Sequence, residues 1–169
     1  MAAGGSVALL LAAGCDQRLD SPFVTPAAAM VAPGTTQPAH AAPTAEQLAQ
    51  YKKQLSPEAY HVLFEAGTEM PFRNAYHDNH AEGTYVSAVT GAALFSSEDK
   101  FDSGTGWPSF TAPLAGHVET KRDFKLVWPR TEYHCARCDG HQGHVFSDGP
   151  KPTGLRYCNN GVALRFEPA

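Results

Sequence analysis

Short β-rich segments, interrupted by glycine and proline, most strongly limit the fold of this 169-residue chain. They begin after Gly83 and are Thr84–Val89, Ala92–Phe95, Val118–Glu119, Lys125–Trp128, Glu132–His134, His144–Phe146, Leu155–Cys158 and Val162–Phe166. The sequence Asn159-Asn160-Gly161 between the last two segments is a strong signal for a tight hairpin. We therefore expect a mainly β (α+β) domain of antiparallel strands with helices at one end.

Two short helices are predicted ahead of these strands. Thr44-Ala-Glu-Gln47 has the form of a capping box, and apolar residues follow it at helical spacing. Ser56-Pro57-Glu58 then offers an N-cap, a proline at the first helical position and an acidic residue in the first turn. Gly67 is the expected stop of this second helix.

The N-terminal part of the chain has a different character. Val7–Ala13 is an apolar run of signal-peptide length, and the following Gly14-Cys15 is similar to a bacterial lipoprotein cleavage site. We therefore expect a leader over 1–20 and export to the periplasm or a lipid anchor on a bacterial membrane. The alternative is a cytoplasmic protein with an alanine-rich N-terminus. Residues 21–45 contain no charged residue and five prolines, which predicts a disordered tether before a domain over 46–169.

Composition excludes several classes of protein. Lys and Arg number 13 against 17 Asp and Glu, so the net charge of −4 gives no basic field for nucleic acid. No apolar run approaches the roughly 20 residues of a membrane span. Four cysteines are too few for a disulfide scaffold in a chain of this length.

The first chemical motif is Cys135-Ala-Arg-Cys138, a spacing found in zinc knuckles and redox dithiols. A structural zinc site needs four ligands, usually from two such pairs, and the other cysteines are only Cys15 and Cys158. His141 and His144 could complete a set, but their spacing is much tighter than that of a zinc finger. A disulfide or two free thiols is the expected state, with no metal.

The second motif surrounds Cys158. Arg156 would share a strand face with this thiol, and a nearby positive charge lowers the pKa of a cysteine. Asn160 adds an amide, and His141 and His144 upstream could donate protons. Taken alone, Cys158 could equally be a buried small apolar residue. The two histidines favour a nucleophile.

Ordered motifs between Leu55 and Phe166 carry a family resemblance. They are Phe72-Arg-Asn-Ala-Tyr76, Asp78-Asn-His80, Glu82-Gly-Thr-Tyr85, Leu94-Phe95, Lys100-Phe101-Asp-Ser-Gly104, Gly106-Trp-Pro-Ser-Phe110, Gly140-His141-Gln-Gly-His144-Val-Phe146, Asp148-Gly-Pro150 and Gly154-Leu-Arg-Tyr-Cys158. With them the sequence closely resembles the methionine-R-sulfoxide reductases of the B class. The resemblance implies two antiparallel sheets in a barrel-like arrangement with short N-terminal helices.

The resemblance also implies roles for the residues around the thiol. Cys158 matches the nucleophile, which attacks the sulfoxide sulfur and is left as a sulfenic acid. His144 and His141 match the active-site histidines that neutralise the departing oxygen. Arg156 would sustain the thiolate, and Asn160 would fix the hydrogen bonds of the site.

The substrate and its partners follow from the same resemblance. Trp107 matches the aromatic residue that packs against the substrate methyl group, and Phe146 is the second expected substrate contact. The substrates would be oxidised proteins, and free methionine sulfoxide is an open alternative. An external thiol reductant such as thioredoxin would recycle the enzyme, which we expect to be a monomer.

The departures from the family concern zinc and recycling. Many members have a resolving cysteine where this chain has Thr105. Zinc-binding members have a second Cys-x-x-Cys pair where this chain has Ser87 and Thr90, so zinc is not expected. Cys135 and Cys138 remain as candidate resolving cysteines. Direct reduction of Cys158 by an external thiol is the preferred prediction.

Two other functions remain open from the residues alone. A thiol hydrolase could use Cys158 and a histidine, although no orienting acid is evident in the sequence. A zinc-knuckle binding module without catalysis would need four ligands and, for nucleic acid, a basic face. The sequence supplies neither, so the reductase is the favoured function.

Overall fold

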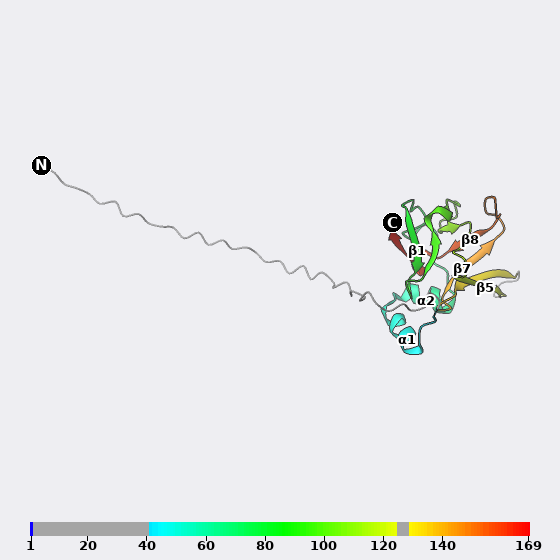
Figure 1. Cartoon of the computed structure of the whole chain (residues 1–169), viewed down its shortest axis with the longest axis horizontal. Coiled ribbons are helices and arrows are strands. Elements are labelled where there is room, and N and C mark those ends of the chain that lie inside the picture. The colour runs from blue at the N-terminus through cyan, green and yellow to red at the C-terminus, as the bar shows by residue number, and fades with distance from the viewer. Residues whose placement is uncertain (2–40, 125–128) are drawn as a thin grey trace. The chain divides into compact units, whose positions relative to one another are not determined.

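The computed structural model describes residues 1, 41–124 and 129–169 of the chain (Figure 1). The predicted leader, most of the predicted tether and the predicted strand at Lys125–Trp128 therefore lie outside the described residues. Among the residues that are described, no helix is both long enough and apolar enough to span a bilayer.

Both predicted helices are present, and Figure 1 shows them gathered at one end of the sheets. Helix α1 is Ala45–Gln54, and its N-cap Thr44 forms both bonds of the capping box with Gln47. Helix α2 is Pro57–Glu65, and the Ser56 hydroxyl accepts from its backbone as an N-cap. The stop differs by one residue from the prediction, because Ala66 takes the left-handed conformation that was expected of Gly67.

The strands form two antiparallel sheets, as expected. The smaller has the order β2-β1-β9, and the larger has the order β3-β4-β8-β7-β6-β5. The strands are β1 Gly83–Ser87, β2 Ala93–Ser96, β3 Lys100–Phe101, β4 Ser109–Phe110, β5 Val118–Asp123, β6 Arg130–Cys135, β7 His141–Phe146, β8 Arg156–Asn159 and β9 Leu164–Pro168. Two 3₁₀ turns, η1 Ser97–Asp99 and η2 Gly161–Ala163, complete the described elements. Strand pairing among the described residues does not close the sheets into one barrel, so the arrangement is only loosely barrel-like.

The predicted hairpin at Asn159-Asn160-Gly161 is wrong. Strands β8 and β9 belong to different sheets: β8 pairs with β4 and β7, whereas β9 pairs with β1. Gly161 and Val162 start η2, and their backbone N–H groups donate to the buried carboxylate of Glu69. The local sequence favours a tight turn here. The contact with the distant loop at Glu69 instead holds the chain in a crossover from one sheet to the other.

Aromatic side chains fill the space between the two sheets. Phe110 of β4 stacks on Phe95 of β2 at a centroid distance of 4.2 Å, and it meets Tyr85 of β1 edge-on at 5.0 Å. Phe95 also contacts Tyr133 of β6, and all four side chains are fully buried. Burial of each stabilises the fold by about 1.5–3 kcal/mol. This core fixes one face of the large sheet and leaves its other face for chemistry.

Strand β7 must approach β8 very closely, and Gly143 makes this approach feasible. A methyl group at Gly143 would overlap the carbonyl oxygen of Cys158 on β8. The absence of a side chain at this position therefore allows the pairing of His144 with Cys158 next to it.

Replacing Gly143 with alanine should lower the free energy of unfolding by about 3 kcal/mol, the upper part of the range for overpacking. Gly154→Ala is the matched control, because its added methyl would meet nothing within 4 Å and only the left-handed backbone (φ +69°) is penalised, by about 1–2 kcal/mol. Denaturant unfolding of both variants measures the difference. Equal stability of the two variants would contradict the steric role of Gly143.

Candidate active site

The functional residues lie on the face of the large sheet that points away from the aromatic core. Residues opposite one another across neighbouring antiparallel strands share a face. One row across the sheet reads Lys121, Glu132, His144, Cys158 and Ser109. The next row on the same face reads Asp123, Arg130, Phe146 and Arg156. Strand pairing thus collects charged and reactive groups from separate segments of the chain.

A β-bulge brings the second histidine to this face. Two residues three apart on a regular strand point to opposite faces, so His141 and His144 should diverge. The register instead shifts within the β6–β7 pairing, and Gln142 is the extra residue. His141 therefore lies opposite His134, and its ring meets that of His144 at a centroid distance of 5.4 Å.

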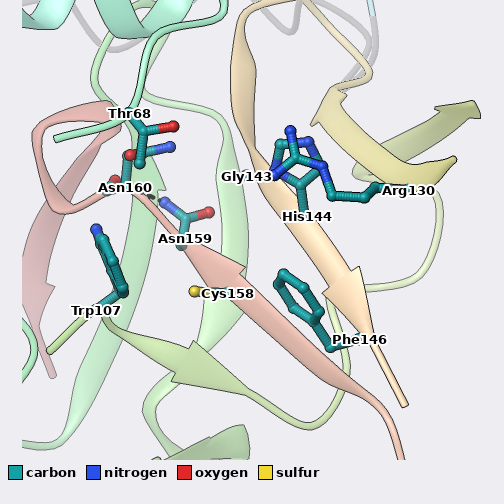
Figure 2. Close-up of a pocket in the computed structure, with 9 residues that line it drawn as sticks. All are labelled: Thr68, Trp107, Arg130, Gly143, His144, Phe146, Cys158, Asn159 and Asn160. Atoms are coloured by element: carbon teal, nitrogen blue, oxygen red, sulfur yellow. Dashed lines mark hydrogen bonds between the residues drawn. The ribbon is translucent and has the colours of Figure 1, made fainter. Parts of the chain in front are cut away.

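A cavity of about 140 Å³ opens at Cys158 (Figure 2). Its lining residues are Thr68, Trp107, Arg130, Gly143, His144, Phe146, Cys158, Asn159 and Asn160. In Figure 2 the sulfur of Cys158 lies between the rings of Trp107 and Phe146. The predicted residues His141 and Arg156 are not among the residues that line this cavity.

Opposing effects set the state of the Cys158 thiol. Burial raises its pKa above the ordinary value for cysteine, and this is the largest effect. The charge of Arg156, a hydrogen bond from its guanidinium and a hydrogen bond from the Thr105 hydroxyl all lower the pKa. Arg156 thus favours the thiolate, but burial outweighs its effect and the net pKa of Cys158 is raised.

Arg156 is held firmly in its position beside the thiol. Its Nε and a terminal nitrogen each donate to a different carboxylate oxygen of Asp148 at 2.9 Å. The guanidinium also lies over the ring of Phe146, 4.5 Å from its centroid. The bidentate pair thus orients a buried positive charge toward Cys158 while Asp148 remains largely in water.

His144 has an orienting acid that the sequence did not reveal. Its Nε2–H donates to Oδ2 of Asp123 at 2.8 Å, and Arg130 donates to the same oxygen at 2.7 Å. Asp123 is buried, so this shared carboxylate fixes the imidazole at the wall of the cavity.

His141 is bound in the same way, one row away. Its Nδ1–H donates to the buried Glu132 at 2.7 Å, and Lys121 lies 3.4 Å from the same carboxylate oxygen. Burial lowers the pKa of His141 below the usual value of histidine, partly offset by its bond to Glu132. Its Nε2 is buried and has no hydrogen-bond partner among the described residues. This histidine is therefore neutral near pH 7.

Asn160 joins the nucleophile strand to a loop that the sequence did not single out. Its side-chain oxygen accepts from the backbone N–H of Glu69 at 3.1 Å, and its amide donates to the Gln142 carbonyl at 2.9 Å. The Glu69 carbonyl accepts from the indole N–H of Trp107 at 3.2 Å. Asn160 thus links the bulge in β7, the turn after β8 and the loop that positions the indole.

The pair Cys135 and Cys138 lies elsewhere. Cys135 follows Tyr133 by two residues on β6, so it faces the core, whereas Cys158 faces the cavity. Strand β7 separates the two strands, and Cys135 is three residues along β6 from Glu132, which lies in the Cys158 row. Strand spacings of about 4.8 Å and rises of about 3.4 Å per residue then give a Cα separation of roughly 14 Å.

The residues around this pair do not fit the thiolate zinc site implied by the resemblance. The Ser87 hydroxyl accepts from the backbone N–H groups of Val89 and Thr90, and the Thr90 hydroxyl accepts from that of Ala92. These hydroxyls cap a turn and carry no charge, so two of the four sulfur ligands are missing. No cluster of three or more His, Cys, Asp or Glu side chains suited to a metal occurs within the described residues.

The site residues that the sequence analysis did not identify were missed for one reason. Asp123, Arg130 and Glu132 stand on β5 and β6, and they enter the site only through strand register. An alternation of charged residues over Arg130–Glu132 could have indicated a polar sheet face, but nothing local connects it with Cys158. Thr105 was noted only as a missing cysteine, yet its hydroxyl bonds the thiol.

Removing the positive charge beside the thiol should raise its pKa further. In an Arg156→Met variant, we expect alkylation of Cys158 to require a higher pH, because burial would then be opposed by fewer favourable contacts. Peptide mass analysis after alkylation over a pH series measures this. Arg165→Met, on β9 of the other sheet, is the control. An unchanged pH profile for Cys158 in the Arg156 variant would contradict the proposed electrostatics.

Comparison with known proteins agrees with this geometry. The SelR domain matches residues 55–168, close to the extent of the resemblance found in the sequence. A peptide methionine sulfoxide reductase MsrB of Bradyrhizobium diazoefficiens is 55% identical over 120 residues, which cover 70% of this chain and 86% of the relative. The protein of the same name from Leptospira interrogans is 52% identical over 69% of this chain and 90% of its own length. One from Methanosarcina barkeri is 50% identical over 70% and 84%. The chain therefore belongs to the SelR family, together with the MsrB peptide methionine sulfoxide reductases.

Proposed function

We propose that this protein repairs oxidised proteins by reducing methionine-R-sulfoxide, with Cys158 as the nucleophile. One observation carries the assignment: in a chain of the SelR family, the Cys158 thiol lies in a cavity lined by the aromatic rings of Trp107 and Phe146 and by His144. The reaction is thiol-dependent, and its product is methionine.

The chemistry of the first step follows from the sulfur of Cys158. Its thiolate attacks the electrophilic sulfur of the sulfoxide, and the sulfoxide oxygen takes up a proton. The S–O bond of the substrate then breaks as the oxygen passes to the cysteine, which releases methionine and leaves a sulfenic acid. The cysteine is oxidised by two electrons and the substrate is reduced by two. Arg156 and Thr105 stabilise the thiolate that burial alone would suppress.

The substrate side chain is apolar on one side and polar on the other, and so is the cavity. Trp107 and Phe146 offer ring faces to the methyl group and methylenes of the substrate. The hydrogen bond from the Trp107 indole to the Glu69 carbonyl fixes one of these rings. The polar wall at His144 and Arg130 then faces the sulfoxide oxygen.

His144 is the proposed proton donor, because it lines the cavity and Asp123 orients it. Its protonated ring donates to the sulfoxide oxygen as negative charge develops there. His141 supports this histidine by ring contact and by its bond to Glu132, and Asn160 holds the adjacent backbone. Both act as positioning residues.

Substitution of the two central residues tests these roles. Cys158→Ser should abolish reduction of methionine-R-sulfoxide, because a hydroxyl is too weak a nucleophile at neutral pH. His144→Ala should lower kcat by about 10²–10⁴, the usual contribution of a positioned general acid. Assays with each sulfoxide epimer, free and in a peptide, provide the measurement.

Activity of the Cys158→Ser variant comparable to wild type would exclude the nucleophile. An unchanged rate for His144→Ala between pH 5 and pH 8 would exclude the general acid. His80→Ala is the matched control, since that histidine is exposed and bonds only Asp78 among the contacts of the described residues.

An external thiol is proposed to recycle the enzyme. The Thr105 hydroxyl bonds the nucleophile but cannot form a disulfide with it. The separation of roughly 14 Å between Cys135 and Cys158, set by the strand spacings, greatly exceeds the roughly 7 Å limit for a disulfide. Cys158 is only half-buried, so a thioredoxin-like dithiol can reach its sulfenic acid.

A single turnover without reductant distinguishes the routes. We expect the loss of one thiol per chain and a dimedone adduct on the Cys158 peptide, because Cys135, at roughly 14 Å by strand spacing, is too far away to condense. Added thiol should form a mixed disulfide with release of water, and a second thiol should restore Cys158. Recovery of a Cys158–Cys135 or Cys158–Cys138 peptide would refute direct reduction.

The setting of the enzyme is proposed from the sequence. The apolar run and Cys15 support export, with the domain tethered in the periplasm or lipid-anchored, and a monomeric state suits a single self-contained site. Cell fractionation with mass analysis of the N-terminal peptide tests this. Recovery of the unprocessed chain in the cytoplasm would refute export.

A further inference from the structure

The buried pair Cys135 and Cys138 has no part in the proposed reaction, yet its two sulfurs are in direct contact. The Cys138 thiol donates a hydrogen bond to the Cys135 sulfur. The backbone N–H groups of Arg137 and Cys138 also donate to Cys135, and that of Gly140 donates to Cys138. Ser87 lies 3.9 Å from the Cys138 sulfur. These contacts lower the pKa of Cys135, whereas the bond to Cys135 and burial raise the pKa of Cys138, so negative charge is favoured on Cys135 alone.

The backbone between the two cysteines is folded into a tight turn. The Asp139 N–H donates to the Cys135 carbonyl at 2.9 Å, and the Cys135 N–H donates to the Gly140 carbonyl at 3.0 Å. The bond from residue i+4 to residue i closes an α-turn, a single turn of helix, and helical geometry separates the Cα atoms of residues i and i+3 by about 5 Å. A disulfide requires a Cα separation in this range.

The pair also lies close to the surface without being open to large reagents. Both cysteines are buried, but the turn that covers them is partly exposed, and the side chain of Asp139 is 78% exposed. A small oxidant such as hydrogen peroxide needs only a local opening of this turn. Oxidants of this class also convert methionine to its sulfoxide, so a repair enzyme for that lesion encounters them.

We propose that Cys135 and Cys138 form an oxidisable dithiol that peroxide converts to an internal disulfide, independently of Cys158. The Cys135 thiolate attacks one peroxide oxygen, the O–O bond breaks, and water leaves after proton uptake. The Cys138 sulfur then displaces the hydroxyl of the resulting sulfenic acid as a second water. Two thiols are oxidised, and one peroxide is reduced to two waters.

The disulfide has a defined consequence for the enzyme. It leaves Cys158 as the only free thiol of the described residues, so an incoming reductant meets a single reactive sulfur. It also protects two buried sulfurs from irreversible oxidation. Because the pair faces the core rather than the cavity, its closure leaves the catalytic face of the large sheet unchanged.

The test uses the full chain with Cys15→Ser and Cys158→Ser, which leaves the pair as its only cysteines. After peroxide treatment and alkylation, we expect a monomer that has lost two hydrogen atoms, takes up no alkyl group and recovers both thiols with dithiothreitol. The same chain with a further Cys138→Ser substitution is the control and should form no internal disulfide. Elemental analysis of the untreated protein accompanies both measurements.

Three results would overturn the proposal. The first is that both thiols of the pair remain open to alkylation after peroxide treatment. The dose for this comparison is one that converts Cys158 of the wild type to a dimedone-reactive sulfenic acid. The second is disulfide-linked dimers in place of the internal disulfide. The third is one tightly held zinc per chain. A Cys138→Ser variant with Cys158 intact should retain wild-type single-turnover rates, and a large loss in a correctly folded sample would contradict the independence of the pair.

Discussion

The pairing of β7 between β6 and β8 is the constraint on which the rest of the structure depends. It sets His144 opposite both Cys158 and Glu132, and the bulge at Gln142 brings His141 to the same face. A regular strand would send one histidine into the aromatic core, where burial of a polar ring without a partner is costly. The backbone irregularity therefore creates the site, and Asn160 stabilises it by donating to the carbonyl of the bulged residue.

The charged side chains on the catalytic face form ion pairs that are only partly exposed to solvent. Asp123 binds His144 and Arg130, while Glu132 binds His141 and Lys121. Each carboxylate is buried and has a cationic partner, which offsets the cost of burial. The Cys158 thiol has Arg156 as its cationic neighbour, but this guanidinium is shared with Asp148. Its weaker support from Arg156 and Thr105 leaves the thiolate reactive, because stronger stabilisation would lower its nucleophilicity.

Local sequence patterns predicted the parts of the fold that are determined locally. The capping box at Thr44 and the N-cap at Ser56 are formed by neighbouring residues, so both helix starts were found. The hairpin at Asn160-Gly161 failed because Glu69 binds the backbone there from 92 residues away. Cys158 and His144 could be predicted from their motifs. Asp123 could not, because its contact with His144 depends on the β5–β6 and β6–β7 registers rather than on any spacing in the sequence.

The two faces of the large sheet separate two kinds of thiol chemistry. On the outer face, Cys158 is partly open to solvent, and Thr105 beside it cannot form a disulfide. On the inner face, Cys135 and Cys138 contact each other and are remote from that acid. A cysteine at position 105 would allow both the oxidation of Cys158 and the formation of a resolving disulfide within one cavity. With threonine there, Cys158 is the only thiol among the described residues that line this cavity.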